Sequence, residues 1–148
     1  MSEVRVPEEI EALATAVVSA AFTVHRTLGP GLLESAYHEC LGIELSLAGL
    51  RVQREQTLPL NYRGHVIQNA YRIDLLINEQ LLVELKTVEA IQPIHRVQVT
   101  TYLRLLKLPL GLLINFNVPL IKDGLTRVLN LDFRPPLSPT LAPSRLRA

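Results

Sequence analysis

The sequence contains few of the residues that mark several common protein classes. Of its 148 residues, one is cysteine, none is tryptophan and 5% are aromatic. The single cysteine, Cys40, excludes an intramolecular disulfide and argues against a zinc site built on cysteines. The four histidines show no zinc-ligand spacing. These absences favour a cytoplasmic protein over a small secreted scaffold.

Long apolar runs and an excess of one charge are also missing. The longest weakly polar run, residues 12–24, is too short to span a bilayer, and the acids before it are atypical of a signal peptide. We therefore expect no membrane partner. The net charge is +1, so the overall balance does not demand a nucleic-acid partner, although a local basic patch can still bind one.

The patterns that are present predict one ordinary domain over residues 1–133. Pro7 and the acids after it begin a helix that "LGPG" ends at 28–31, and a second helix is expected at 33–48. Strands are expected at 52–60, 65–70, 71–78 and 81–86, followed by a helix at 94–107 and strands at 110–115 and 125–131. This order predicts an α/β or α+β domain with a mixed sheet. Residues 134–148 are rich in proline, which predicts a disordered tail.

The stretch "YRIDLLINEQLLVELK", residues 71–86, places Asp74 and Glu84 inside apolar strands. With a loop at 78–80, the register of the hairpin pairs residues whose numbers sum to the same value: Ile77 with Leu81, Leu75 with Val83, Ile73 with Leu85, Asp74 with Glu84 and Arg72 with Lys86. Two carboxylates this close should not both ionise unless a cation such as Mg²⁺ neutralises them. On these residues alone, a solvated ladder of surface charges is an equally good interpretation.

The acids and the lysine form a D-x(n)-E-x-K pattern that resembles the PD-(D/E)XK nuclease superfamily. In addition, "GPGLLESAY" at 29–37 is similar to the signature of the GxxExxY protein family, with Gly31, Glu34 and Tyr37 at its three fixed positions. The resemblance continues through "VELKTVEAI" and "HRVQVTTYL" and covers about residues 10–131. It implies an α/β domain of restriction endonuclease-like type, with a central mixed β-sheet flanked by α-helices. The proline that often precedes the first acid is replaced here by isoleucine.

The resemblance also implies roles for individual residues. Asp74 and Glu84 would hold Mg²⁺ or Mn²⁺ with help from Glu34, Lys86 would be the catalytic cation, and Gln98 would complete the catalytic set. The implied activity is metal-dependent hydrolysis of phosphodiester bonds in DNA or RNA, and a homodimer would suit the cutting of both strands. Without an ion, the helix dipole alone would stabilise the glutamate of the second helix.

Two other functions are compatible with the same residues. The chain could be a nucleic-acid-binding module that keeps the site without cutting, or an accessory interaction protein whose acids only support the fold. Binding without cleavage would favour the first alternative, and the absence of Mg²⁺ binding would favour the second.

On the helix at 94–107, we expect His95 and Tyr102 to pack and to form hydrogen bonds.

Overall fold

The computed structural model describes residues 4–135, so the predicted tail lies outside the described residues apart from its first two positions. Along the chain the elements are α1 (Glu8–Leu28), α2 (Glu34–Leu47), β1 (Val52–Tyr62), β2 (His65–Ile77), β3 (Leu81–Lys86), α3 (Pro93–Leu106), β4 (Leu110–Asn115), the 3₁₀ helix η1 (Ile121–Gly124) and β5 (Leu125–Leu129). The two segments predicted at 65–70 and 71–78 form one continuous strand. No helix within the described residues has the length and apolar character needed to cross a bilayer.

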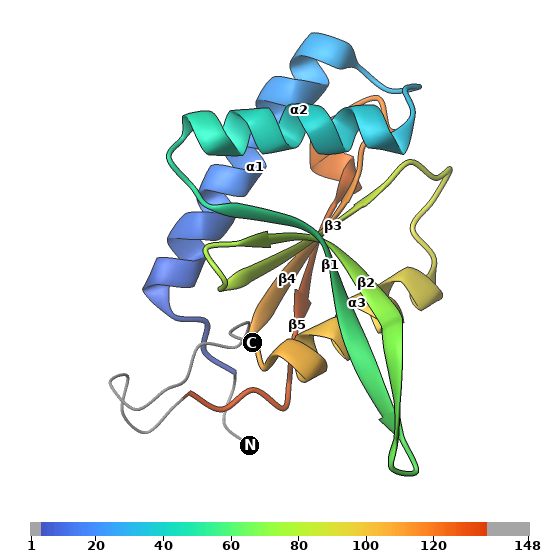
Figure 1. Cartoon of the computed structure of the whole chain (residues 1–148). Helices are drawn as coiled ribbons and strands as arrows, with labels where there is room; N and C mark the ends of the chain where they lie inside the picture. The colour runs from blue at the N-terminus through green and yellow to red at the C-terminus, as the bar shows by residue number, and fades with distance from the viewer. Residues whose placement is uncertain (1–3, 136–148) are drawn as a thin grey trace.

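The five strands form one mixed sheet in the order β1-β2-β3-β4-β5. Among the strands within residues 4–135, only β3 and β4 pair in parallel, and α3 makes the crossover between them, as a parallel connection requires. The other neighbours are antiparallel. The far half of the β1–β2 hairpin projects beyond the rest of the sheet (Figure 1). The predicted α/β fold with a central mixed sheet flanked by helices is confirmed.

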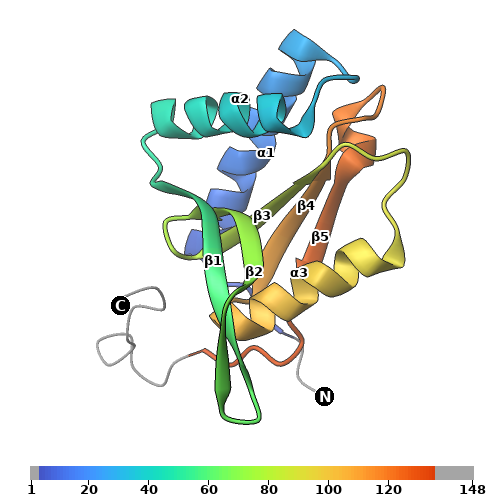
Figure 2. The same cartoon turned by 45° about the vertical axis from the view of Figure 1, so that its right-hand side comes forward.

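Helices cover both faces of the sheet, which gives three layers (Figure 2). On one face, α1 and α2 pack over a cluster that includes Val17, Leu41, Leu75, Val83 and Ile114. On the other face, α3 packs over a cluster that includes Ile73, Leu76, Leu82, Leu103 and Leu113. Both faces of β3 and β4 are buried, and most of the side chains of these strands are apolar, as is typical of such strands.

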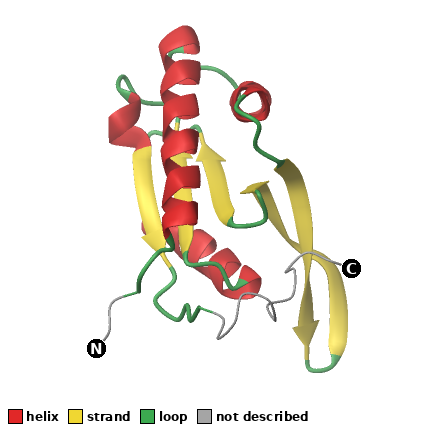
Figure 3. Ribbon diagram, turned by 90° about the vertical axis from the view of Figure 1, so that its left-hand side faces the viewer, coloured by secondary structure: helices red, strands yellow, loops and turns green. Residues whose placement is uncertain are grey.

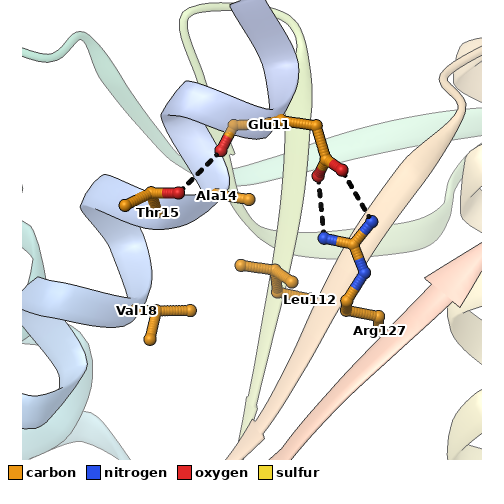
Figure 4. A pocket seen from close by; sticks show the side chains of 6 residues that line it. All are labelled: Glu11, Ala14, Thr15, Val18, Leu112 and Arg127. Atoms are coloured by element: carbon orange, nitrogen blue, oxygen red, sulfur yellow. Dashed lines mark hydrogen bonds and ion pairs between the residues drawn. The ribbon is translucent and has the colours of Figure 1, made fainter. Parts of the chain in front are cut away.

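The edge strand β5 is held against α1, the long helix that runs across the sheet in Figure 3. Arg127 donates two hydrogen bonds to the Glu11 carboxylate, at 2.8 and 3.2 Å. Figure 4 shows this pair beside a hollow of about 350 Å³ between α1 and the sheet. Both side chains are about half exposed, so the pair contributes little stability and mainly orients the helix on the strand.

The β2–β3 hairpin has the predicted loop and, near that loop, the predicted register. Ile77 pairs with Leu81 and Leu75 pairs with Val83, but the ladder ends there. The prediction that Ile73 lies opposite Leu85 on one face is wrong, because Ile73 belongs to the cluster under α3 and Leu85 to the cluster under α1 and α2. The alternation of side chains is interrupted at the residue between Ile73 and Leu75, which is Asp74.

Candidate metal centre

Asp74 lies where β2 loses its regular pairing with both neighbouring strands. In the ladder with β1, Leu75 pairs with Arg54 and Ile73 pairs with Gln56, but Asp74 has no partner between them. Glu55, at the matching position of β1, has a positive φ of 51°, which is uncommon for a residue other than glycine. The backbone of Asp74 is therefore free to bond outside the sheet ladders.

The side chains of Asp74 and Glu84 replace the missing ladder bonds. Each carboxylate accepts a hydrogen bond from a backbone N–H of the other strand. The N–H of Asp74 donates to Oε2 of Glu84 at 2.6 Å, and the N–H of Leu85 donates to Oδ2 of Asp74 at 2.8 Å. The structure thus brings the two acids together, as the hairpin register predicted, but through side-chain contacts with the backbone. These bonds also fix the direction of each carboxylate.

Glu84 is the most deeply buried acid in this group, with a relative exposure of 2%. Burial and, to a smaller extent, the charge of Asp74 raise the pKa of its carboxyl from 4.5 to about 8, against the opposing effects of the Asp74 N–H and of Lys86. In the protein without a bound cation, this shift favours the protonated form of Glu84. A divalent cation beside it would favour the ionised form instead.

Glu34 begins α2, and the short connection from α1 determines where that helix starts. Gly29 and Gly31 have positive φ values of 69° and 98°, which glycine adopts without strain. The hydroxyl of Tyr37 donates to the Gly29 carbonyl at 2.6 Å and accepts the Leu32 N–H at 3.2 Å. The Tyr37 ring is fully buried and stacks on Phe116 at 4.5 Å between centroids.

Lys86, at the end of β3, is positioned from the opposite face of the sheet. Its Nζ donates to Oε1 of Gln98 on α3 at 3.2 Å, and Nε2 of Gln98 donates to the Tyr102 hydroxyl at 3.1 Å. Burial raises the pKa of the Tyr102 phenol, and its hydrogen bond with Gln98 opposes that rise. Gln98 therefore contacts the lysine, and Tyr102 in turn holds Gln98.

The backbone beyond Lys86 is held by the buried side chain of Asn115. Its amide accepts the Val88 N–H at 3.1 Å and donates to the Val88 carbonyl at 2.9 Å. The Phe116 N–H donates to the Lys86 carbonyl at 3.0 Å, which extends the pairing of β3 with β4. The end of β3 is thus fixed to β4, which is itself in the core.

His95 was predicted to form hydrogen bonds. Its Nδ1 accepts the N–H of Gln92 at the start of α3 at 2.9 Å.

His38 is a member of the group that sequence reasoning missed. Its Nε2 lies 3.6 Å from Oδ2 of Asp74 and 3.8 Å from Oε2 of Glu34, and its side chain is 15% exposed. A search for zinc spacing among the histidines could not find it, because its partners are carboxylates. The available signal was its position four residues after Glu34, which places both side chains on one face of α2.

The donor set is suitable for a divalent cation. Ligand atoms of Glu34, His38 and Asp74 all lie within 4.8 Å of one another. For comparison, donors bound at about 2.1 Å around an octahedral ion lie about 3.0 Å apart when adjacent and about 4.2 Å apart when opposite. Glu84 is outside this group of three but is hydrogen-bonded to the backbone of Asp74. The three donors therefore lie close to the spacing that one ion requires.

Comparisons with known proteins give one family match and one similar solved structure. Residues 11–128 match the family model of the PD-(D/E)XK nuclease superfamily. The crystal structure of SSO0001 is similar over 82% of this chain with 23% sequence identity and a TM-score of 0.46, and the match spans 58% of that solved chain. A comparison with curated proteins gives no match.

Proposed function

Because the chain belongs to the PD-(D/E)XK nuclease superfamily, we propose that it is a metal-dependent nuclease that hydrolyses phosphodiester bonds in nucleic acid. One observation carries the proposal: Asp74 and Glu84 meet at a break in the sheet, with Glu34 facing them from α2 and Lys86 following on β3. At this break the Asp74 N–H bonds Glu84 and the Leu85 N–H bonds Asp74, so both carboxylates are held close together. Converging carboxylate oxygens are the ligands that a hard divalent cation prefers.

In this proposal Glu34, Asp74 and Glu84 hold Mg²⁺ or Mn²⁺. A divalent ion bound there would activate water and neutralise charge that develops on the phosphoryl oxygens. The backbone bonds of Asp74 and Glu84 keep their carboxylates in place, so little reorganisation is needed when substrate arrives. The chain's own contribution is thus a cluster of oxygen donors in which Glu84 is buried and Asp74 and Glu34 are partly exposed.

Lys86 supplies an amino group close to these acids. The hydrogen bond from its Nζ to Gln98 holds the ammonium at one place on the α3 side of the sheet. An ammonium held there can stabilise an oxyanion on the attacked phosphate. Gln98 then acts by positioning the lysine. The nucleic acid, the cytoplasmic location and the homodimer that would suit double-strand cutting remain predictions from the sequence.

We also propose membership of the narrower GxxExxY family. Support comes from the geometry of the three signature residues in this chain. Gly31 occupies a backbone conformation that favours glycine, Glu34 faces Asp74 across His38, and Tyr37 ties the α1–α2 connection to the core. Each signature position thus helps to place one carboxylate, which gives a physical reason for the spacing of three residues.

The proposal is tested by incubating the purified protein with single- and double-stranded DNA and RNA in the presence of Mg²⁺ or Mn²⁺. We expect cleavage by the wild type, and its loss in Asp74→Asn and in Lys86→Met. The matched control is Glu89→Gln, which removes an exposed acid three residues beyond the lysine. Circular dichroism verifies that each variant is folded.

The outcomes separate the proposal from its alternatives. Cleavage that survives in both variants would refute the assigned site. Binding of nucleic acid without cleavage by the folded wild type would instead favour the non-cleaving module. If the protein neither cleaves nor binds Mg²⁺ or Mn²⁺ in calorimetry, the acids serve only the fold.

A further inference from the structure

His38 places a nitrogen donor among acids that are otherwise a typical all-oxygen cation site. One ring atom, Nε2, faces both neighbouring carboxylates, at 3.6 Å from Asp74 and 3.8 Å from Glu34. The Asp74 oxygen nearest to it is held by the N–H of Leu85. The imidazole therefore lies between the two acids that a bound cation would have to bridge.

From this geometry we infer that His38 is itself a ligand of the ion and makes the site selective for transition-metal ions such as Mn²⁺ over Mg²⁺. The inference rests on the proposed function, because it concerns the same site. The three donors belong to two elements: Glu34 and His38 lie four residues apart on α2, and Asp74 comes from β2. Together they supply two carboxylates and one imidazole.

The chemistry of the donors determines the preference. Mg²⁺ binds oxygen ligands and loses its water reluctantly, whereas imidazole is a good ligand for transition-metal ions. Replacing one oxygen of the site with a nitrogen thus penalises Mg²⁺ relative to Mn²⁺. The position of the ring also shields the site, since its side chain is 15% exposed while that of Glu34 is 44% exposed.

An imidazolium that forms ion pairs with both acids is the competing explanation for the same distances. The two explanations predict opposite effects when the ring is removed. A ligand contributes to metal binding, so its loss weakens the binding of Mn²⁺. A positively charged ring competes with the cation for the same carboxylates, so its loss strengthens metal binding.

The experiment measures the binding of Mn²⁺ and Mg²⁺ by calorimetry in the wild type, His38→Gln and His38→Glu, with His65→Gln as the control for an exposed histidine on β2. Pulsed electron paramagnetic resonance of bound Mn²⁺ detects ¹⁴N coupling from a coordinated ring. We expect that coupling in the wild type and in the control. In His38→Gln we expect its loss and a fall of about tenfold or more in the affinity for Mn²⁺ relative to Mg²⁺. In His38→Glu the preference should move further towards Mg²⁺.

Absence of ¹⁴N coupling in wild-type protein with bound Mn²⁺ would overturn the inference, even if the variants failed to fold. Tighter binding of Mn²⁺ by His38→Gln would also overturn it. Neither result would contradict the nuclease proposal if Asp74→Asn still loses both metal binding and cleavage of nucleic acid. Conversely, nitrogen coordination in a protein that cuts no nucleic acid would uphold the inference and refute the nuclease.

Discussion

Replacing Glu84 by glutamine should stabilise the protein without metal, and the gain should depend on pH. Glu84 has its pKa raised from 4.5 to about 8. Between these two pH values, the folded protein retains a proton that the unfolded chain has released. The free energy of unfolding therefore falls as pH rises from about 4.5 to about 8. The full shift corresponds to a loss of at most about 5 kcal/mol, and relaxation of the site would reduce it to a few kcal/mol.

Glutamine resembles the protonated glutamic acid in shape and cannot ionise. In the presence of a chelator, the free energy of unfolding of Glu84→Gln should match that of the wild type near pH 4.5. It should exceed that of the wild type by a few kcal/mol at pH 8. Urea unfolding followed by circular dichroism at several pH values measures this difference directly. All other ionisable groups are the same in the two proteins. Their contribution to the pH dependence therefore cancels when the two free energies of unfolding are subtracted.

Glu89→Gln serves as the control, because it neutralises an exposed acid on the loop after β3. Its difference from the wild type should stay within about 0.5 kcal/mol at every pH. Saturating Mn²⁺ should reverse the order of Glu84→Gln and the wild type at pH 8, since the ion binds the ionised carboxylate of the wild type. The reasoning would be refuted if the difference in the free energy of unfolding between Glu84→Gln and the wild type did not change between pH 5 and pH 8.

Three further predictions concern the residues that position the site. Tyr37→Phe should lower the free energy of unfolding by about 1–2 kcal/mol in urea, because the carbonyl of Gly29 loses its donor at 2.6 Å; an unchanged value would contradict this role. Gly111→Ala should cost about 1–3 kcal/mol in the same assay, since a Cβ there would lie 2.8 Å from Cγ1 of Val99 on α3. Tyr102→Phe should lower the cleavage rate but leave Mn²⁺ affinity unchanged in calorimetry, because its hydroxyl holds the glutamine that contacts the proposed catalytic lysine and touches none of the proposed metal ligands.

The elements of the fold were predictable because their signals are local. Proline at the start of α3, the glycines after α1 and the apolar alternation of the β2–β3 hairpin each act over a few residues. The predicted strand at 110–115 coincides with β4. The continuity of β2 was not predicted. The two segments are joined by their pairing with β1, which continues on both sides of an irregularity between Leu58 and Leu60.

The candidate site was predictable in part. The hairpin register correctly indicated that Asp74 and Glu84 come close together, since a loop of three residues determines which positions meet. It failed one residue further on, at Ile73, because it assumed a regular pleat beyond the loop. Carboxylates that accept backbone N–H groups compete with the ladder, and this competition is not visible in an alternating pattern.

The sequence by itself determined which residues form helices and strands, where the acids and the lysine fall along them, and which superfamily the chain resembles. All of these depend on neighbours in the chain. Only the tertiary structure decided that His38 faces Asp74, and that Gln98 holds Lys86 from the opposite side of the sheet. Those contacts join different elements, and their distances depend on how two helices pack against the two faces of one sheet.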